Sequence, residues 1–493
     1  MEKMTRNYTY ALLPTPVQLQ ALENAGTKSR ILWNELVRHT RHALHECKNG
    51  RRASIINEYA KMFAGKKLTG RRAGEVKKLA EQENISIEKA LELFISKRIE
   101  KDTAIKRRKD GSRYRRFSNI HLARLYAGEK VNTLKNHILK DGSSAIGFSI
   151  LRHWDDFCNS WEKRVHQAPR FKKKGQTSAI QKQIISTSAF TFGKYVDLSW
   201  CGSPCLSQVE ITEDRPLPQE STIKQISLKK NPIGRWYITC TIEADKSVFT
   251  RDFGPPTEKI VGIDPGMKSA ITTSDGEKFT PKSLSKDNRL EKKLRKLQRK
   301  VDRQFRKGNP HCYNPDGTWK RGTKAKFRSK RLLETTKQIA KIKLHFKNAK
   351  SDYYHKLAIH FLRNYDVIGI GDVKLHTLAK GQGKQKKSFN TISREHAISE
   401  FKAKTKDKAN LSLTPKEVYD IIESYTTIMC NSCKHMNTDI DLNTRIWKCS
   451  NCGAKHDRDV NAAINIKNKT ISERMAAASH AVSGEKIPQK SAS

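Results

Sequence analysis

Four cysteines near the end of the chain have the spacing of a metal site. They form two C-x2-C pairs that are fifteen residues apart: Cys430, Cys433, Cys449 and Cys452. Each pair presents two thiolates from one tight turn, and two such turns complete a tetrahedral shell around one Zn2+ ion. No histidine or carboxylate falls in phase with the pairs, which predicts a structural zinc without an open ligand position. The ion would stabilise a minidomain that is too small for its own core.

Acids at the ends of apolar segments form a second candidate site. Asp264 follows the apolar run IVGI and precedes Pro-Gly, so we expect its carboxylate at the end of a buried strand, although such an acid can also be only a turn former. Asp459 lies beyond the cysteines in HDRDVNAAINI, where an acid opens an amphipathic helix whose Ala462 and Ala463 can pack closely on a sheet. Carboxylates gathered in this way hold two Mg2+ ions for phosphodiester cleavage.

The charge of the chain indicates a polyanionic partner. The 493 residues include 97 Lys and Arg against 50 Asp and Glu, which gives a net charge of +47. Because the cations are spread along the whole chain, nucleic acid is favoured over acidic lipid or acidic protein. The first residues lack an apolar signal core and no stretch approaches 18 apolar residues, so we expect no membrane partner and a place in the cytoplasm or nucleoid.

Two basic segments are the candidate nucleic-acid contacts. IKRRKDGSRYRRF alternates cations with aromatic side chains, and APRFKKKG is a basic loop. Cation runs are often only solvated surface, but the interleaved aromatics and the overall charge favour a polynucleotide. The predicted contacts are Arg107, Arg108, Arg113, Tyr114, Arg115, Arg116, Arg170, Lys172, Lys173 and Lys174.

The pattern of apolar residues predicts a multidomain α+β protein with two to four domains. A strand at residues 8–12 precedes a series of helices, and the short strands that follow could form a small antiparallel barrel with it. Buried strands and long basic helices alternate in the second half of the chain. The expected ranges are helices at 16–44, 51–140 and 146–165, strands between 179 and 243, strands at 259–264 and 365–373, helices at 283–358 and 392–408, and a third strand from 417.

The order of motifs in the second half carries a family resemblance. IVGIDPG, VIGIGDVKL, ESYTTIMCNSC and WKCSNCGAKHDRDVNAAINI resemble the split RuvC nuclease of transposon-encoded TnpB proteins and of miniature type V CRISPR effectors. The likeness spans about residues 6–468 and is least specific in the basic block 47–140. It implies an oligonucleotide-binding-like wedge β-barrel (1–15 and 178–250), a helical recognition lobe (16–177), an RNase H-like RuvC domain (257–425 and 457–470), a zinc ribbon that binds target nucleic acid (426–456) and a disordered tail (471–493).

The resemblance implies RNA-guided, Mg2+-dependent cleavage of double-stranded DNA next to a short flanking motif. The implied partners are a guide RNA and the DNA target, with a homodimer as an open question. Asp264 matches the first catalytic acid of the family and Asp459 the last, whereas Asp457 is expected to begin the helix.

The middle acid is where the sequence departs from the family. Gly371 stands at the usual position of a glutamate and is followed by Asp372, while IIESYTT supplies Glu423 at the next strand. Neighbouring strands lie about 5 Å apart, so a glutamate moved by one strand can reach the same ions. We expect Glu423 to be the middle ligand, with Asp372 as the alternative. A nuclease-dead, RNA-guided repressor and a DNA-acting transposase or accessory protein remain open as other functions.

Overall fold

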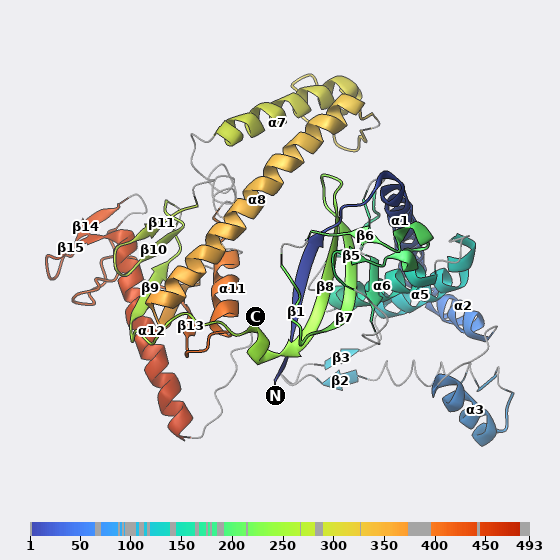
Figure 1. Cartoon of the computed structure of the whole chain (residues 1–493), viewed down its shortest axis with the longest axis horizontal. Helices are drawn as coiled ribbons and strands as arrows, with labels where there is room; N and C mark the ends of the chain where they lie inside the picture. Colours follow the sequence, from blue (N-terminus) through green and yellow to red (C-terminus); the bar gives the residue numbers. More distant parts are fainter. Residues whose placement is uncertain are drawn as a thin grey trace. The chain divides into compact units, whose positions relative to one another are not determined.

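The computed structural model divides into two compact units, Met1–Asp245 and Lys246–Ser493, and both mix helices with β-sheet (Figure 1). It describes residues 2–483 except for 65–70, 87–88, 91–92, 94–104, 108–112, 116–118, 139–143, 163–166, 174–175, 178–179, 185–191, 213–214, 267, 282–288, 326, 373–395 and 441–443. None of the described helices combines the length and the apolar character that crossing a bilayer requires.

The main sheet of the first unit has four antiparallel strands. Their order is β1 (Lys3–Ala11), β8 (Trp236–Asp245), β7 (Thr222–Lys230) and β4 (Ile180–Gln183). The N-terminal strand pairs with β8 along its whole length and buries Tyr8 and Tyr10, which confirms the predicted strand and its partner sheet. The short strands β5 (Tyr195–Val196) and β6 (Val209–Glu210) form a separate pair.

Helix α1 (Pro16–Lys48) begins where its sequence places a capping box. The Thr15 side chain accepts from the Gln18 amide, the Gln18 side chain accepts from the Thr15 amide, and proline occupies the first turn. The other named helices of this unit are α2 (Arg52–Ala64), α3 (Arg71–Glu83), α5 (Asn119–Ile138) and α6 (Ser144–Glu162). Trp33 of α1 meets Trp154 of α6 edge to face, with ring centroids 5.4 Å apart.

Two sequence expectations for the first unit were wrong. The apolar pattern of residues 146–165 predicts a core stripe that includes Phe148 and Trp154, but the buried stripe of α6 contains Ile146, Ile150 and Trp154, and Phe148 is 60% exposed. Residues 146, 150 and 154 are four positions apart and lie on one face of the helix, so position 148 does not lie on this buried face. The basic helical block also contains a hairpin of β2 (Ile105–Arg107) and β3 (Arg113–Arg115). The sequence between these strands holds an Asp-Gly pair, which disfavours a continuous helix.

The second unit is built on a five-stranded sheet with the order β11-β10-β9-β12-β13. Its strands are β9 (Ile260–Asp264), β10 (Ile271–Thr273), β11 (Lys278–Phe279), β12 (Val367–Gly371) and β13 (Glu417–Ile421). β10 and β11 run antiparallel as a hairpin after β9, while β12 and β13 run parallel to β9. The three apolar strands predicted from the sequence therefore lie side by side at the centre and one edge of one sheet.

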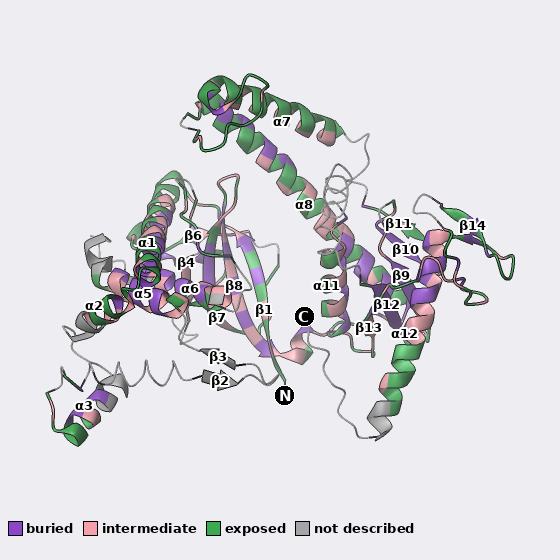
Figure 2. Cartoon of the chain, turned by 180° about the vertical axis from the view of Figure 1, so that it is seen from behind, coloured by how far each residue is buried: buried purple, intermediate pink, exposed green. Residues whose placement is uncertain are grey.

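The two faces of this sheet have different covers because side chains alternate along each strand. Ile263 and Ile368 point into a core with α8 (Lys330–Asn364) and α11 (Ile398–Ala409), where Phe361 and Phe401 are fully buried. On the other face, alternate positions of the strands are glycines, such as Gly262 and Gly369, and helix α12 (Arg458–Ser483) packs directly against them. Helix α7 (Arg289–Gly308) packs on α8 and buries none of its residues fully (Figure 2).

The predicted disordered tail is wrong for residues 471–483, because α12 continues to Ser483. This half of the helix is mostly exposed, as Figure 2 shows, so tertiary packing does not explain it. Its sequence ISERMAAASHAVS holds three consecutive alanines and neither glycine nor proline, so intrinsic propensity favours the helix. Arg474 also pairs with Glu417 of β13 at 3.3 Å. Residues 484–493 lie outside the described part of the chain.

Candidate metal centres

Asp264 lies at the end of the central strand β9, beneath helix α12. It is 7% exposed and shares its face of the sheet with Gly262. A Cβ atom at Gly262 would lie 2.1 Å from the Ala463 carbonyl oxygen, so the backbone of α12 touches the strand there. This close approach brings the first turn of α12, with Asp459, to Asp264. Burial and then the negative charge of Asp459 raise the pKa of Asp264 to about 7.

The start of α12 is fixed by Asp457. Its carboxylate accepts hydrogen bonds from the Asp459 and Val460 amides at 3.0 and 3.3 Å, which confirms Asp457 as the helix-start residue. Asp457 also pairs with Lys278 of β11 at 2.8 Å. The helix therefore presents Asp459 from its first turn, where that residue is 9% exposed.

Arg445 is a contact of Asp459 that the sequence analysis missed. Its Nη1 atom lies 3.2 and 3.4 Å from the two carboxylate oxygens of Asp459, and its carbonyl accepts from the Arg458 amide at 2.8 Å. Arg445 comes one residue before strand β14 (Ile446–Lys448) of the cysteine segment. The sequence offers one signal, an arginine among the residues between the cysteine pairs, but nothing there indicates which acid it reaches.

Glu423 lies two residues beyond β13 and fills the space next to Gly371. A Cβ atom at position 371 would be 2.1 Å from the Glu423 Oε1 atom. This oxygen is buried and has no hydrogen-bond partner. Burial, followed by the charges of Asp264 and Asp372, raises the pKa of Glu423 to about 8, while Lys402 opposes the shift.

Asp372 has a different environment from Glu423. Its side chain is 53% exposed, and its Oδ1 atom lies 2.9 Å from Lys402 Nζ. The same Lys402 ammonium contacts Asp420 Oδ1 at 3.0 Å. Asp372 is thus paired with a cation and exposed to solvent. The neighbouring Glu423 Oε1 atom is buried and has no hydrogen-bond partner.

The three carboxylates suit a divalent cation. They come from β9, the segment after β13 and α12, and the pKa values of two of them are raised by burial and by neighbouring acids. Buried carboxylates that repel one another are stabilised by a bound Mg2+ ion, and the orphaned Glu423 oxygen would gain a ligand bond. Asp264, Glu423 and Asp459 are therefore the residues that could hold the metal.

The four cysteines come together as their spacing predicts. Their Sγ atoms all lie within 4.8 Å of one another. Two similar turns present them, because the Lys434 amide donates to the Cys430 carbonyl at 2.9 Å and the Gly453 amide donates to the Cys449 carbonyl at 3.0 Å. Lys434 and Gly453 both adopt positive φ angles, 62° and 71°. The set of four thiols in a small volume fits one tetrahedral Zn2+.

A histidine accompanies these thiols, contrary to the expectation that none would be in phase. The Nε2 atom of His456 lies 3.1 Å from Cys430 Sγ, and its ring packs on Trp447 with centroids 4.7 Å apart. His456 stands on β15 (Lys455–Asp457), directly opposite Trp447 on β14. Asn437 likewise donates to Cys449 Sγ at 3.6 Å. Since a thiolate ligand is stabilised by such donors, His456 and Asn437 surround the candidate zinc site without being needed as ligands.

The predicted nucleic-acid contacts have mixed outcomes. Arg170 and Lys173 are exposed in the loop, as expected. Lys172 is not, because its Nζ atom lies 4.4 Å from the centre of the Trp33 ring, and burial lowers its pKa to about 8. The pair of hydrogen bonds between Lys172 and Asn34 explains this inward placement. The others lie outside the described residues, in full or by their side chains: Arg107, Arg108, Arg113, Tyr114, Arg115, Arg116 and Lys174.

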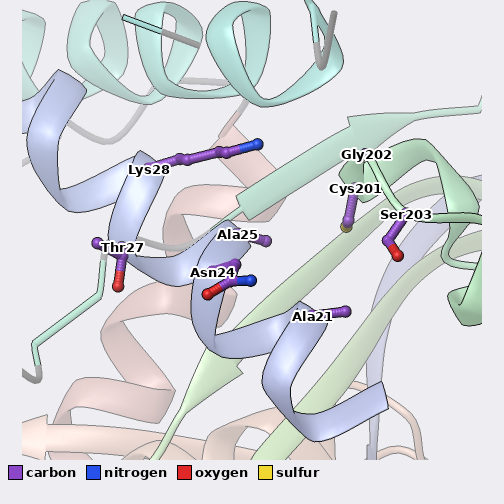
Figure 3. Close-up of a pocket in the computed structure, with 8 residues that line it drawn as sticks. All are labelled: Ala21, Asn24, Ala25, Thr27, Lys28, Cys201, Gly202 and Ser203. Carbon is purple, nitrogen blue, oxygen red and sulfur yellow. The ribbon is translucent and has the colours of Figure 1, made fainter. Parts of the chain in front are cut away.

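A small hollow of about 290 Å3 also lies in the first unit, between α1 and the 3-10 turns at residues 199–206 (Figure 3). Its lining consists of Ala21, Asn24, Ala25, Thr27, Lys28, Cys201, Gly202 and Ser203. No residue that we predicted for a site contributes to it.

Comparison with known proteins shows that the residues of both centres lie in ranges that match protein families. Residues 399–466, which contain the four cysteines, Glu423 and Asp459, match the "Cas12f1-like, TNB domain" family. Residues 243–382, which contain Asp264 and Gly371, match the "Probable transposase" family OrfB_IS605. In these two ranges the chain is similar to Cas12f1-like proteins and to the OrfB_IS605 transposases. The two matches follow one another along the chain and together cover most of its second unit.

Individual relatives agree with this family relationship. The "Putative RNA-guided DNA endonuclease" of Streptomyces pristinaespiralis is 28% identical over 332 residues, which are 66% of this chain and 72% of that protein. The "Putative RNA-guided DNA endonuclease InsQ" of Escherichia coli K12 is 24% identical over 347 residues, or 68% and 76% of the two chains. Among solved structures, the Cas12f1-sgRNA-target DNA complex aligns over 94% of this chain and 99% of that one, with 13% identity and a TM-score of 0.43.

Proposed function

We propose that the chain is an RNA-guided, Mg2+-dependent endonuclease that cuts double-stranded DNA next to a short flanking motif. The observation that carries the proposal is the position of Glu423, which fills the space beside Gly371 and whose pKa is raised to about 8 by burial and by the charges of Asp264 and Asp372. Two buried acids, Asp264 and Asp459, and the half-buried Glu423 come from distant segments, and the charge of Asp459 acts on Asp264 as that of Asp264 acts on Glu423. Without a cation this arrangement is unfavourable, which is typical of a functional site rather than of a structural one.

The fold of the second unit supports an RNase H-like RuvC domain. Asp264 ends the central strand of a mixed sheet, with a hairpin on one side and two parallel strands on the other, as a catalytic acid of the domain that the resemblance implies would require. In this proposal the RuvC-like domain is formed by 257–425 and 457–470, with 426–456 as a zinc ribbon. The first unit would supply the wedge barrel, from 1–15 and 178–250, and the recognition lobe, from 16–177.

The relatives and the charge support the partners. Two relatives that share about two thirds of this chain are named RNA-guided DNA endonucleases. A net charge of +47 matches a polyanion, and pairing with a guide RNA would supply the sequence specificity. A homodimer has no observation in its favour and is not part of the proposal.

The mechanism assigns each group a separate task. Asp264, Glu423 and Asp459 would hold Mg2+, which supplies a nucleophilic water and stabilises the leaving oxygen. Asp457 orients Asp459 by fixing the first turn of α12. Arg445, whose guanidinium lies beside Asp459, would bind a non-bridging oxygen of the scissile phosphate because its planar fork suits phosphate. Lys402 holds Asp372 by an ion pair, which leaves Glu423 as the middle acid of the site.

Sequencing the RNA that copurifies with the protein is the first test. A defined RNA with a variable end should program cleavage of matching duplex DNA in Mg2+, and EDTA should abolish it. Guided binding without cleavage in Mg2+ or Mn2+ would favour the nuclease-dead repressor. Absence of bound RNA, together with activity on transposon ends, would favour a transposase or its accessory protein.

A further inference from the structure

The end of the helical hairpin formed by α7 and α8 is a small folded segment, described at residues 305–325 and 327–329, which we call the α7–α8 tip. Tyr313 and Trp319 form an isolated antiparallel β-bridge, and the Asn314 amide donates to the Thr318 carbonyl at 2.9 Å. The connecting turn has the sequence Asn-Pro-Asp-Gly, with proline at its second position and Gly317 at a φ of 77°. These residue types favour a tight turn, so the sequence specifies this conformation locally.

Buried Asn309 fastens the two ends of the α7–α8 tip together. Its Nδ2 group donates to the carbonyls of Phe305 and Phe327 at 3.1 and 2.9 Å, and its Oδ1 atom accepts from the Phe327 amide at 3.0 Å. Asn309 is fully buried, so these bonds are protected from water. These bonds hold the α7–α8 tip in one conformation and so fix the positions of the side chains on its surface.

Two large aromatic side chains are exposed on the surface of the α7–α8 tip. Trp319 is 44% exposed, although it packs on Phe305 at 6.4 Å and meets Tyr313 edge-on at 5.5 Å. Phe327 is 55% exposed. Because the packing fixes the Trp319 ring while leaving almost half of the residue in solvent, the indole is prepared to stack on a planar partner.

The charge around these aromatics is almost entirely positive. Residues 305–329 include seven Lys and Arg and a single acid, Asp316, whose carboxylate accepts from the Thr318 amide at 2.8 Å. The exposed cations are Arg306, Lys307, Lys320, Arg321, Lys324 and Arg328. Helix α7 extends this surface, because its lysines and arginines are exposed whereas its leucines are half-buried. Figure 2 shows mostly exposed residues along this helix.

We propose that the α7–α8 tip binds unpaired nucleotides of an RNA, with one base stacked on Trp319 and adjacent phosphates on Lys320 and Arg321. Exposed aromatics among cations suit a strand that offers both π faces and phosphates. Bases inside a duplex are already stacked on one another, so only an unpaired or terminal base can use the indole. An acidic protein would match the cations but would not require the planar ring. The inference deepens the RNA-binding part of the proposed function and does not depend on the metal centre.

The test uses the full-length protein, stripped of nucleic acid at high salt, with two probes of equal length: fluorescent oligouridine and blunt-ended RNA duplex. Trp319→Ala should weaken oligouridine binding about 5- to 100-fold, which corresponds to one lost stacking contact. Duplex affinity should stay within about twofold. Since the indole is neutral, the slope of affinity against salt should not change. The double variant K320A/R321A should instead weaken both probes and reduce that slope for oligouridine by about 1.4.

Two further variants separate stacking from folding of the α7–α8 tip. Trp319→Tyr keeps an aromatic plane and should restore most of the affinity. Tyr195→Ala removes a matched aromatic, 47% exposed and located beside Lys194 in the first unit, and should leave both probes unaffected. Photocrosslinking with 4-thiouridine RNA should label a peptide of the tip in the unmodified protein, and this product should be lost in Trp319→Ala.

Unchanged oligouridine affinity and crosslinking in Trp319→Ala would overturn the proposal, as would an equal loss for both probes. If polyglutamate competes with the RNA probe, and its binding depends on Trp319 as strongly as RNA binding does, the α7–α8 tip is a protein-docking surface instead. The outcome is separable from the endonuclease proposal. If guided cleavage is absent while oligouridine binding depends on Trp319, the endonuclease proposal fails and the tip assignment stands.

Discussion

The carboxylate of Glu423 occupies the space that any side chain at position 371 would need. A Cβ atom there would lie 2.1 Å from Glu423 Oε1 and 2.9 Å from its Cγ atom. Gly371 follows the alternation of β12 and faces the same side of the sheet as Gly369, whose absent side chain makes room for Thr470 of α12. The glycine of β12 and the glutamate that follows β13 therefore fit together as one structural unit.

Gly371→Ala is the first prediction. The added methyl must displace the Glu423 carboxylate, so Mg2+-dependent cleavage should fall by more than about 10-fold, because a misplaced ligand loses catalysis steeply. Single-turnover cleavage rates and a thermal melt would measure both effects. Gly128→Ala is the control, because no atom lies within 4 Å of its added Cβ and helix α5 should tolerate it. Full activity of Gly371→Ala would show that Glu423 is not a ligand.

Removal of single acids is the second prediction. Asp264→Ala, Glu423→Ala and Asp459→Ala should each lower guided cleavage by more than about 100-fold while guide and target binding persist. Asp372→Ala should be mild, because Asp372 pairs with Lys402 at the surface. Cleavage gels and filter binding on the same preparations separate the two readouts. The reverse result, with Asp372 essential and Glu423 dispensable, would place the middle ligand on β12.

The third prediction concerns Arg445, which contacts both oxygens of Asp459. If it binds the scissile phosphate, Arg445→Ala should lower the cleavage rate about 10- to 100-fold at saturating Mg2+, and Arg445→Lys should restore only part of the loss. A different result would assign another role. Faster cleavage by Arg445→Ala at limiting Mg2+ would mean that the guanidinium only competes with the metal for Asp459.

The fourth prediction is one Zn2+ per chain. Cys→Ser at position 430, 433, 449 or 452 should release the metal and expose the amides of the ribbon to hydrogen exchange. His456→Ala should keep zinc at high concentrations but lower its affinity about 10- to 100-fold, because His456 contacts a ligand sulfur and is not itself needed as a ligand. Elemental analysis of the purified protein checks the stoichiometry. Intact protein without zinc would contradict the assignment.

The fifth prediction is a pH dependence with opposite signs for stability and for metal binding. The pKa of Asp264 is raised to about 7 and that of Glu423 to about 8, so the folded state without metal resists deprotonation. Its stability should therefore fall as the pH rises from about 4 to 8, whereas Mg2+ affinity should increase over the upper part of this range as the ligands deprotonate. Denaturant melts in EDTA at pH 5.5 and 8 measure the first effect, and calorimetric titration measures the second.

Glu423→Gln supplies the matched control for this pH dependence. The amide has nearly the same shape but does not ionise, so it should stabilise the protein in EDTA at pH 8 by on the order of 2 kcal/mol and have little effect at pH 4. A stability that does not change with pH in the unmodified protein would mean that the acids do not repel one another as their burial indicates.

Local patterns in the sequence determined the parts of both centres that depend on neighbours along the chain. Two C-x2-C pairs dictate two turns that present thiols, and an apolar run before Asp264 dictates a buried strand that ends in an acid. Asp457 could be separated from Asp459 in the same way, because a helix cap is a contact between residues two or three apart. Periodicity also placed the three central strands and the long helices α7 and α8.

Only the tertiary structure decided which distant groups meet. The contacts of Glu423 with the Gly371 position, of Arg445 with Asp459 and of Lys172 with Trp33 join residues from separate elements, and no spacing along the chain encodes them. Packing set these pairs: glycines at alternate positions let α12 touch the sheet, and one missing Cβ left room for a carboxylate from the neighbouring strand. Side-chain direction depends on what covers each face of the sheet, and this cover is a property of the assembled fold.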